Sequence, residues 1–320
     1  MGDTPESENM VQAQGNRRNA AIALIIAIVL TLGIIVAAKV VQDKQASNPV
    51  ALSSPDMPDN NAPECAELLG RLPERVDGLV RAELADPAPA GAAVWRDVED
   101  HRITLRCGAP VPTQYNELAK TQNVDGVKWL RVVDAADENL VTWFAVGRSP
   151  VVAVTSDPTR EDALKELAES LRPDTEFTKK PELSPIPLSD AKAPHNDKLC
   201  KSFIAALPKE LGGRKLVDGL DVPDGMVVWS DDNGDIVSLR CGLEEPTSYA
   251  DTTEQLTQVN DIVWFNEPTM SAGTTSAWYA MGRERYVAVD LPVSEGAQIM
   301  PLLSDIIASN LKNISPSEEK

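Results

Sequence analysis

The most prominent feature of the hydrophobic pattern is an uncharged run near the N-terminus. Residues 20–38, AAIALIIAIVLTLGIIVAA, are apolar apart from one threonine, and basic residues stand on both sides of them. As a helix this run would rise about 28 Å, close to the hydrocarbon thickness of a bilayer. We therefore predict a transmembrane helix over residues 20–41, after a cytoplasmic tail over residues 1–19. A cleaved signal peptide is the alternative, although its apolar core is usually only about 7–15 residues long.

Two polar segments farther along the chain have no apolar periodicity. Residues 42–64 are rich in Pro, Ser, Asn and Asp, and residues 174–197 are rich in proline. Such compositions are typical of linkers rather than packed elements. We predict a flexible stalk over the first segment, an extended linker over the second, and a disordered tail over residues 314–320.

The stretches between these segments share one pattern. Alignment of ITLRCG, at 103–108, with VSLRCG, at 237–242, also aligns AAVWRD with MVVWSD, PTQY with PTSY, and WFAVGR with WYAMGR. The alignment places all the cysteines and tryptophans at equivalent positions of two units. This period is much longer than that of a solenoid repeat. We therefore predict two tandem repeat domains, over residues 65–173 and 198–313.

The pattern inside one unit predicts a helix at each end and strands between them. Residues 66–73 and 158–171 carry apolar side chains at helical spacing, whereas the runs between them alternate apolar and polar residues or are rich in valine. Alternation places Ile103, Leu105 and Cys107 on one face of their strand. Consecutive strands with terminal helices are typical of an α+β fold. We predict a mainly antiparallel sheet of about five strands, with both helices on one side.

The cysteines suggest one pairing and one compartment. There are four, Cys65, Cys107, Cys200 and Cys241, and none is part of a Cys-x-x-Cys pair. Four cysteines allow three pairings, but each duplicated unit has to fold with its own pair, which predicts Cys65–Cys107 and Cys200–Cys241. Four buried free thiols are the alternative. Because disulfides persist in oxidising compartments, we expect a single-pass plasma-membrane protein with extracytoplasmic C-terminal domains.

Several stretches of the chain resemble a known family. The stretches CAELLGRLPERVDGL, GAAVWRD, ITLRCGAP, VDGVKWL and FAVGR are similar to an actinobacterial envelope family known as a domain of unknown function, number 3515. Its members typically carry a membrane anchor and one such domain, whereas this chain has two copies. The resemblance implies an actinobacterial plasma-membrane protein that faces the wall. It implies no activity, substrate or catalytic residue.

Composition and the absence of known motifs limit the kinds of ligand and reaction that the sequence predicts. The formal net charge is -19 and the pI is about 4.5. An acidic surface of this kind repels the phosphate backbone of nucleic acids, so we predict no nucleic-acid binding. No nucleophile elbow, zinc-protease helix, phosphate loop or calcium loop is present, and DDNGD at 231–235 fits a hairpin turn better than a calcium loop. His101 and His195 fall in an expected turn and linker. We therefore predict no catalytic residue, cofactor or metal site.

Two sets of side chains recur in both units and are candidates for binding. The arginines could recognise an anion or a carboxylate through bidentate hydrogen bonds, or could form local salt bridges or stack on tryptophan. The tryptophans are expected in the cores, with sugar stacking as the alternative. The candidate anion-binding residues are Arg106, Arg148, Arg240 and Arg283. The expected core aromatics are Trp95, Trp129, Trp143, Trp229, Trp264 and Trp278.

The sequence thus predicts a membrane-anchored protein whose two disulfide-bonded modules bind or scaffold other molecules without catalysis. Its expected partners are the lipid bilayer, through the N-terminal helix, and an envelope protein or cell-wall component. An enzyme of cell-wall metabolism with an arginine-lined anion site is the alternative. A further interpretation is that one unit binds and the other acts as a spacer.

Overall fold

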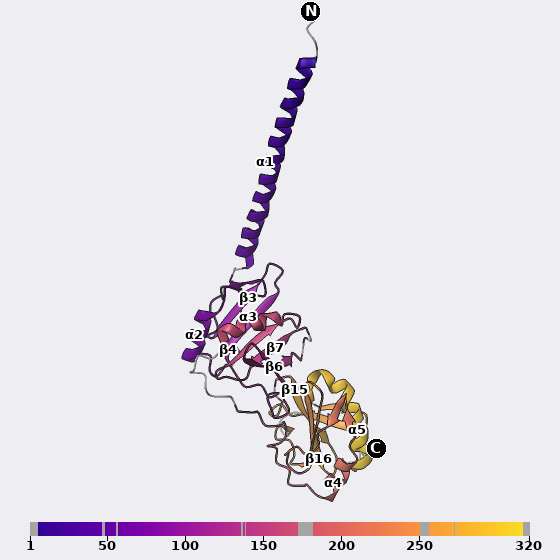
Figure 1. The fold of residues 1–320 in the computed structure, drawn as a ribbon. Coiled ribbons are helices and arrows are strands. Elements are labelled where there is room, and N and C mark those ends of the chain that lie inside the picture. The colour runs from indigo at the N-terminus through magenta and orange to yellow at the C-terminus, as the bar shows by residue number, and fades with distance from the viewer. Residues whose placement is uncertain are drawn as a thin grey trace, which may run out of the picture.

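The protein consists of a long N-terminal helix and two repeats, as the computed structural model shows (Figure 1). The helix α1 (Glu6–Ala46) contains one span, Ile22–Val41, that is long and apolar enough to cross a membrane. A signal sequence would meet the same criteria. The structure describes residues 6–46, 49–55, 57–135, 137, 139–171, 182–249, 256–271 and 273–315.

The first repeat is one antiparallel sheet of eight strands with a helix before it and a helix after it. The strand order is β1-β2-β3-β4-β8-β7-β6-β5, so two four-stranded meanders join where β4 pairs with β8. The elements are α2 (Pro63–Arg71), β1 (Arg75–Val76), β2 (Leu79–Ala82), β3 (Ala92–Arg96), β4 (Arg102–Ala109), β5 (Thr121–Val124), β6 (Val127–Val133), β7 (Val141–Ala145), β8 (Val151–Ser156) and α3 (Asp162–Leu171).

The second repeat has the same topology. Its strand order is β13-β14-β15-β16-β12-β11-β10-β9, and β12 pairs with β16 as β4 pairs with β8. The elements are α4 (Lys198–Ala205), β9 (Glu210–Leu211), β10 (Arg214–Leu216), β11 (Met226–Ser230), β12 (Ile236–Leu243), β13 (Leu256–Val259), β14 (Ile262–Asn266), β15 (Thr275–Met281), β16 (Tyr286–Pro292), the 3-10 helix η2 (Val293–Glu295) and α5 (Gly296–Asn310).

The expected number of strands, about five, is wrong: each sheet has eight. The additional strands are only two to four residues long and belong to tight hairpins at both ends of the sheet. In the first repeat these hairpins turn at Asp77-Gly78 and Asp125-Gly126, whose positive φ angles are typical of two-residue hairpin turns. Such short strands offer too few positions for an alternating pattern to show.

Both helices of each repeat lie on one face of the sheet and enclose the main core. In the first repeat this core includes Leu68 on α2, Trp95, Leu105 and Val154 on the sheet, and Leu167 on α3, all essentially buried. The disulfides Cys65–Cys107 and Cys200–Cys241 fasten the first helix of each repeat to its longest strand. These are the pairs that the duplication predicts. Closing loops with separations of 42 and 41 residues stabilises each repeat by up to about 4 kcal/mol on the chain-entropy account.

The opposite face of each sheet is covered by the chain segment that precedes the first helix. We call residues 49–55 and 57–60 the first strap and residues 182–196 the second strap. In the first strap, Val50 pairs with Leu84 and is buried. In the second strap, Ile186 and Leu188 are buried against the strands. These parts of the expected flexible stalk and linker are therefore packed elements of the repeats.

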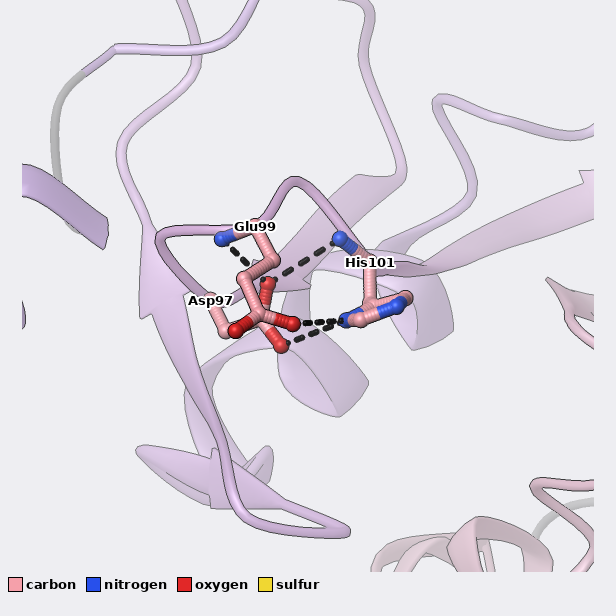
Figure 2. Close-up of side chains that lie close together, drawn as sticks. All are labelled: Asp97, Glu99 and His101. Carbon is pink, nitrogen blue, oxygen red and sulfur yellow. Dashed lines mark hydrogen bonds and ion pairs between the residues drawn. The ribbon is translucent and has the colours of Figure 1, made fainter.

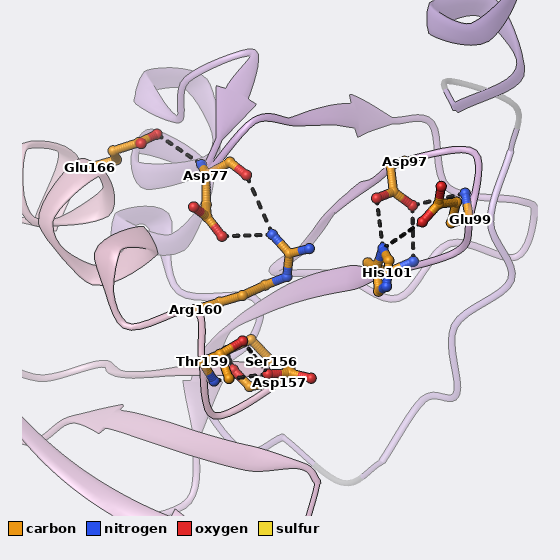
Figure 3. A network of polar contacts seen from close by, with 9 residues as sticks. All are labelled: Asp77, Asp97, Glu99, His101, Ser156, Asp157, Thr159, Arg160 and Glu166. Carbon is orange, nitrogen blue, oxygen red and sulfur yellow. Dashed lines mark hydrogen bonds and ion pairs between the residues drawn. The ribbon is translucent and has the colours of Figure 1, made fainter.

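The closing helix of each repeat is tied to the first hairpin by an ion pair. Arg160, just before α3, donates to the carboxylate of Asp77 at 2.6 Å, and Glu166 on α3 accepts from the Asp77 backbone N–H at 3.0 Å (Figure 3). In the second repeat the polarity is reversed, because Arg214 on β10 pairs with Glu295 at the start of α5. The duplicated fold has kept the contact and exchanged the charges.

Candidate functional site

The two repeats contact each other through loops and the second strap. Gln114 Nε2 donates to Thr274 Oγ1 at 2.5 Å, and the Ser184 N–H donates to the Tyr115 carbonyl at 2.8 Å. The β11–β12 hairpin packs so closely on the first repeat that a Cβ atom on Gly234 would lie 2.7 Å from the Leu118 carbonyl oxygen. In Figure 1 the β6–β7 end of the first repeat accordingly lies beside β15 of the second.

Adjoining cavities lie along this junction. One, of about 410 Å³, is bounded by the second strap, Met270 and the β15–β16 surface; a second, of about 280 Å³, lies toward the start of α5. A third, of about 360 Å³, lies over the outer face of β6 and β7. All three include Thr113 in their lining, so they adjoin one another along the junction, and together we call them the cleft. Its size is in the range of small-molecule binding sites.

Asp290 on β16 lies in the wall of the largest of these three cavities. The residue is 1% exposed, its Oδ2 accepts from Thr275 Oγ1 at 3.1 Å, and no described residue donates to its Oδ1. Burial raises the pKa of Asp290 to about 7, although the Thr275 hydrogen bond acts in the opposite direction. The equivalent residue of the first repeat is Thr155, which exchanges a 2.8 Å hydrogen bond with Thr142. A carboxyl group at this position is therefore not a requirement of the fold.

The other charged residues along the cleft are also acidic. Asp190 lies in the wall of the largest cavity, and Asp134, Asp235 and Glu295 in that of the adjoining one, whereas neither of these two walls includes a lysine or an arginine from the described part of the chain. Burial and the nearby Asp231 raise the pKa of Asp235. The acidic walls of these two cavities therefore disfavour the binding of anions and favour the binding of cations.

Sequence comparison identifies the family. The family described as "Protein of unknown function (DUF3515)" matches residues 24–179 and, separately, residues 173–315. The chain belongs to this family. Its two DUF3515 copies correspond to the two repeats, and the second match begins before the second strap, which supports counting that strap as part of the domain. No curated protein matches the chain in sequence.

Two of the four candidate arginines hold the closing helices of the DUF3515 repeats. Arg148 donates to the carbonyl of Leu171, the last residue of α3, at 2.8 Å, and Arg283 donates to the carbonyl of Leu311, the C-cap of α5, at 3.1 Å. Cations at helix C-termini satisfy free carbonyls and complement the helix dipole. Burial, and to a smaller extent the charge of Arg71, lower the pKa of Arg148 to about 10.

The other two arginines face the straps on the opposite side of the sheets. Arg240 Nη1 donates to the carbonyls of Leu188, Ser189 and Ala191, at 2.6 to 2.8 Å. Arg106 makes only a 3.4 Å contact, to Ser53 Oγ. Arg106 and Arg148 thus lie on opposite faces of one sheet and do not share a site. Anion binding by these arginines stays a prediction to which the geometry lends no support.

The tryptophans lie on the inner faces of the sheets, against the helices. Five are at most 2% exposed, and Trp278 is partly buried against the second core. Trp95 and Trp229 make the same hydrogen bond in both repeats, with Nε1 donating at 2.9 Å to the carbonyls of Pro73 and Pro208. This burial is what a core role requires and leaves those rings no face for a sugar.

A small surface cluster was missed by sequence reasoning. Asp97, Glu99 and His101 share the β3–β4 turn, where His101 Nδ1 lies 2.8 Å from Asp97 Oδ2 and 3.9 Å from Glu99 Oε2 (Figure 2). Burial acts to raise the pKa of Asp97, but hydrogen bonds from the His101 side chain and backbone outweigh it and lower that pKa. The alternating Asp-x-Glu-x-His pattern was the available signal.

Hydrogen bonding within the β3–β4 turn is sufficient to explain why Asp97, Glu99 and His101 lie close together. Asp97 Oδ1 accepts from the backbone N–H groups of Glu99 and His101, and Asp231 makes the same two bonds in the second repeat, to Asn233 and Asp235. Both aspartates therefore hold their hairpin turns through side-chain-to-backbone hydrogen bonds, and DDNGD forms the predicted hairpin turn. The second repeat has no histidine at this turn, so the cluster is not a shared feature of the family fold in this chain.

Asp290 was also missed, although the sequence contains a signal for it. The matching strands read VVAVTS and YVAVDL, so a charged residue replaces a threonine in the middle of a valine-rich, buried strand. A charge in such a strand is costly unless it is paired. The comparison of the two repeats shows that the charge is specific to the second.

Proposed function

We propose that this chain is a single-pass membrane protein of the actinobacterial cell envelope, with a cytoplasmic N-terminus and two extracytoplasmic repeats that act together as a binding module. The observation that carries the proposal is the combination of one apolar span, Ile22–Val41, with a disulfide in each of the two repeats that follow it. Disulfides of this kind belong to oxidising compartments. The resemblance to envelope proteins supports the same location.

Binding, rather than catalysis, is the activity that the geometry favours. Three of the four candidate arginines, Arg148, Arg240 and Arg283, are directed at backbone carbonyls, and the four lie on opposite sheet faces rather than around one anion site. The cleft between the repeats has the size of a small-molecule binding site. An envelope protein, a wall component or a small molecule of that compartment is the ligand we expect.

Two measurements on cells test this proposal. Protease treatment of intact spheroplasts should remove both repeats while an epitope at the N-terminus stays protected and attached to the membrane. Alkylation and peptide mapping without reduction should recover Cys65 linked to Cys107 and Cys200 linked to Cys241. An epitope released from the membrane fraction would show cleavage of the N-terminal helix, and alkylated, free cysteines would contradict the extracytoplasmic location.

A further inference from the structure

The starting observation is a buried carboxyl group that the fold does not need. Asp290 is almost completely enclosed, and its Oδ1 receives no hydrogen bond from the described residues. Burying a carboxylate away from water is costly, and leaving a buried oxygen without a hydrogen bond adds to that cost. Because Thr155 occupies the same position in the first repeat, the second repeat bears a cost that its twin avoids. Costs of this kind are typical of functional sites.

The neighbouring cation does not relieve this cost. Arg240 is on β12, two residues beyond Ser238, the residue in register with Asp290. Its Nη1 is directed at three carbonyls of the second strap, and burial alone, apart from the Thr275 contact, accounts for the raised pKa of Asp290. No lysine or arginine of the described residues forms an ion pair with Asp290, so a cationic ligand would supply a charge that the described part of the repeat does not.

The cavity beside Asp290 restricts what that charge can be. Its wall combines apolar side chains, including Ile186, Leu188 and Met270, with the carboxyls of Asp190 and Asp290. Among the described residues, the one group of three carboxylate or imidazole donors that lie close enough for a single metal ion is in the Asp97 turn. A carboxylate inside a partly apolar cavity is better suited to an ammonium group carried on a small organic body than to a bare metal ion.

We propose that the cleft between the repeats binds a small organic amine, whose ammonium group pairs with the Asp290 carboxylate while its body contacts the second strap and Met270. This inference names the ligand class of the binding module proposed above and rests on that module being a binding protein. Thr269 and Thr275 also lie in the wall, and a hydroxyl oxygen that donates its own hydrogen can still accept an ammonium N–H group. A neutral analogue would leave the Asp290 carboxylate without a positively charged partner.

The test compares amines with neutral analogues of the same shape on the purified full-length chain. The probes are cyclohexylamine and glucosamine, with cyclohexanol and glucose as their neutral counterparts, and binding is followed by ligand-observed NMR and by thermal shift at pH 8. We expect saturable binding of at least one amine, and binding of its neutral counterpart that is weaker by roughly tenfold or more. The cyclohexyl and sugar pairs distinguish a hydrocarbon amine from an amino sugar.

Variants assign the effect to Asp290. Asp290→Asn keeps the shape of the side chain and removes its charge, and Asp290→Thr introduces the residue of the first repeat. If circular dichroism shows that one variant folds poorly, the other is used to test amine binding. Both should weaken amine binding by roughly tenfold or more. Asp162→Asn, an exposed carboxyl on α3, is the matched control and should bind like the wild type. The full-length chain is purified in detergent. Because the wild type and the three variants share the same detergent, partition of the probes into it cannot produce a difference between them.

Three results would overturn the inference. They are neutral counterparts that bind as tightly as the amines, an Asp290→Asn variant that binds the amines unchanged, and no binding of either amine up to about 10 mM, tenfold weaker than a millimolar ligand. These results leave the cellular location untouched, because they are obtained on purified protein. Conversely, failure of the spheroplast and cysteine-mapping experiments would refute the location without bearing on amine binding by the purified protein.

Discussion

Each residue of the recurring Leu-Arg-Cys-Gly stretch has its own structural task. Leu105 fills the core under the helices, Arg106 faces the strap, and Cys107 forms the disulfide to α2. Gly108 adopts φ 82°, and a Cβ atom there would lie 2.2 Å from the Asp59 carbonyl carbon, where the first strap crosses the strand. Four successive residues thus connect the sheet with the core, the strap and the first helix, which explains why the stretch was kept in both copies.

At the residue scale, Asp290 predicts a pH-dependent stability. Its pKa is about 7 in the folded protein against a reference value of 3.8, so between these values the folded state holds a proton that the unfolded state releases. Stability contributed by this group therefore falls as pH rises through that window, by up to about 4 kcal/mol. We expect Asp290→Asn to be more stable than the wild type at pH 8, with an advantage that shrinks toward pH 4.

Urea unfolding of both proteins at several pH values provides the measurement. The titratable groups on the surrounding elements are Arg240 on β12, Tyr279 on β15 and Asp190 in the second strap. Burial and the charge of Glu267 raise the pKa of Tyr279 to about 12, so it does not titrate in this window. A stability difference between the two proteins that does not change with pH would contradict the assignment.

At the scale of elements, the straps give the two sheets their second buried layer. In the second repeat every residue of β12 is buried, because the helices cover one face and the strap covers the other. In the first repeat β4 still has partly exposed positions on the strap side. Leu188 in the second strap has φ 71°, which is unfavourable for a residue with a side chain. Arg240 holds this conformation by binding the Leu188 carbonyl.

We expect Arg240→Met to loosen the second strap. The variant loses hydrogen bonds from a charged donor to three carbonyls, each worth about 1.5–3 kcal/mol when made singly, although bonds that share one donor are not additive. A loss of roughly 2–4 kcal/mol in unfolding free energy, with faster amide hydrogen exchange over residues 184–193, is the predicted outcome. Arg106→Met, which removes one 3.4 Å contact, is the matched control. Equal effects of the two substitutions would show that Arg240 does not hold the strap.

At the scale of the whole molecule, the packed straps shorten the connection to the membrane and join the two repeats. The apolar span ends at Val41, α1 continues to Ala46, and Val50 is already paired with Leu84. If α1 spans the bilayer, the first repeat therefore lies close to the membrane surface. The second strap contacts the first repeat through Ser184, so the two repeats form a common cleft.

The junction predicts a specific effect of one glycine. Gly234 has φ 86° and contacts the first repeat, whereas Gly219 has φ 76° with open space around it. An alanine costs about 1–2 kcal/mol at either position because of the backbone conformation. Only Gly234→Ala also collides with the Leu118 backbone. We therefore expect Gly234→Ala, but not Gly219→Ala, to speed hydrogen exchange over residues 114–120 and to weaken amine binding. Equal exchange in the two variants would contradict the proposed junction.

Much of the fold could be predicted from the sequence because the same pattern of residues occurs twice in the chain. The duplicated cysteines, tryptophans and apolar runs predicted two α+β repeats, mainly antiparallel sheets with helices on one side, and the disulfide pairs. The apolar span was visible because it depends on length and composition alone. The short hairpin strands were missed because two to four residues, several of them charged, do not reveal a period.

The straps and the cleft were decided only by the tertiary structure. A strap is an extended, proline-containing segment, and its buried residues, such as Val50, Ile186 and Leu188, follow no period because they fit a surface made by other strands. The cleft depends on how Thr113, the second strap and Asp290 meet across the junction. A sequence fixes local periodicity and the chemistry of each position, whereas contacts between distant segments arise only when the sheets, straps and repeats pack together.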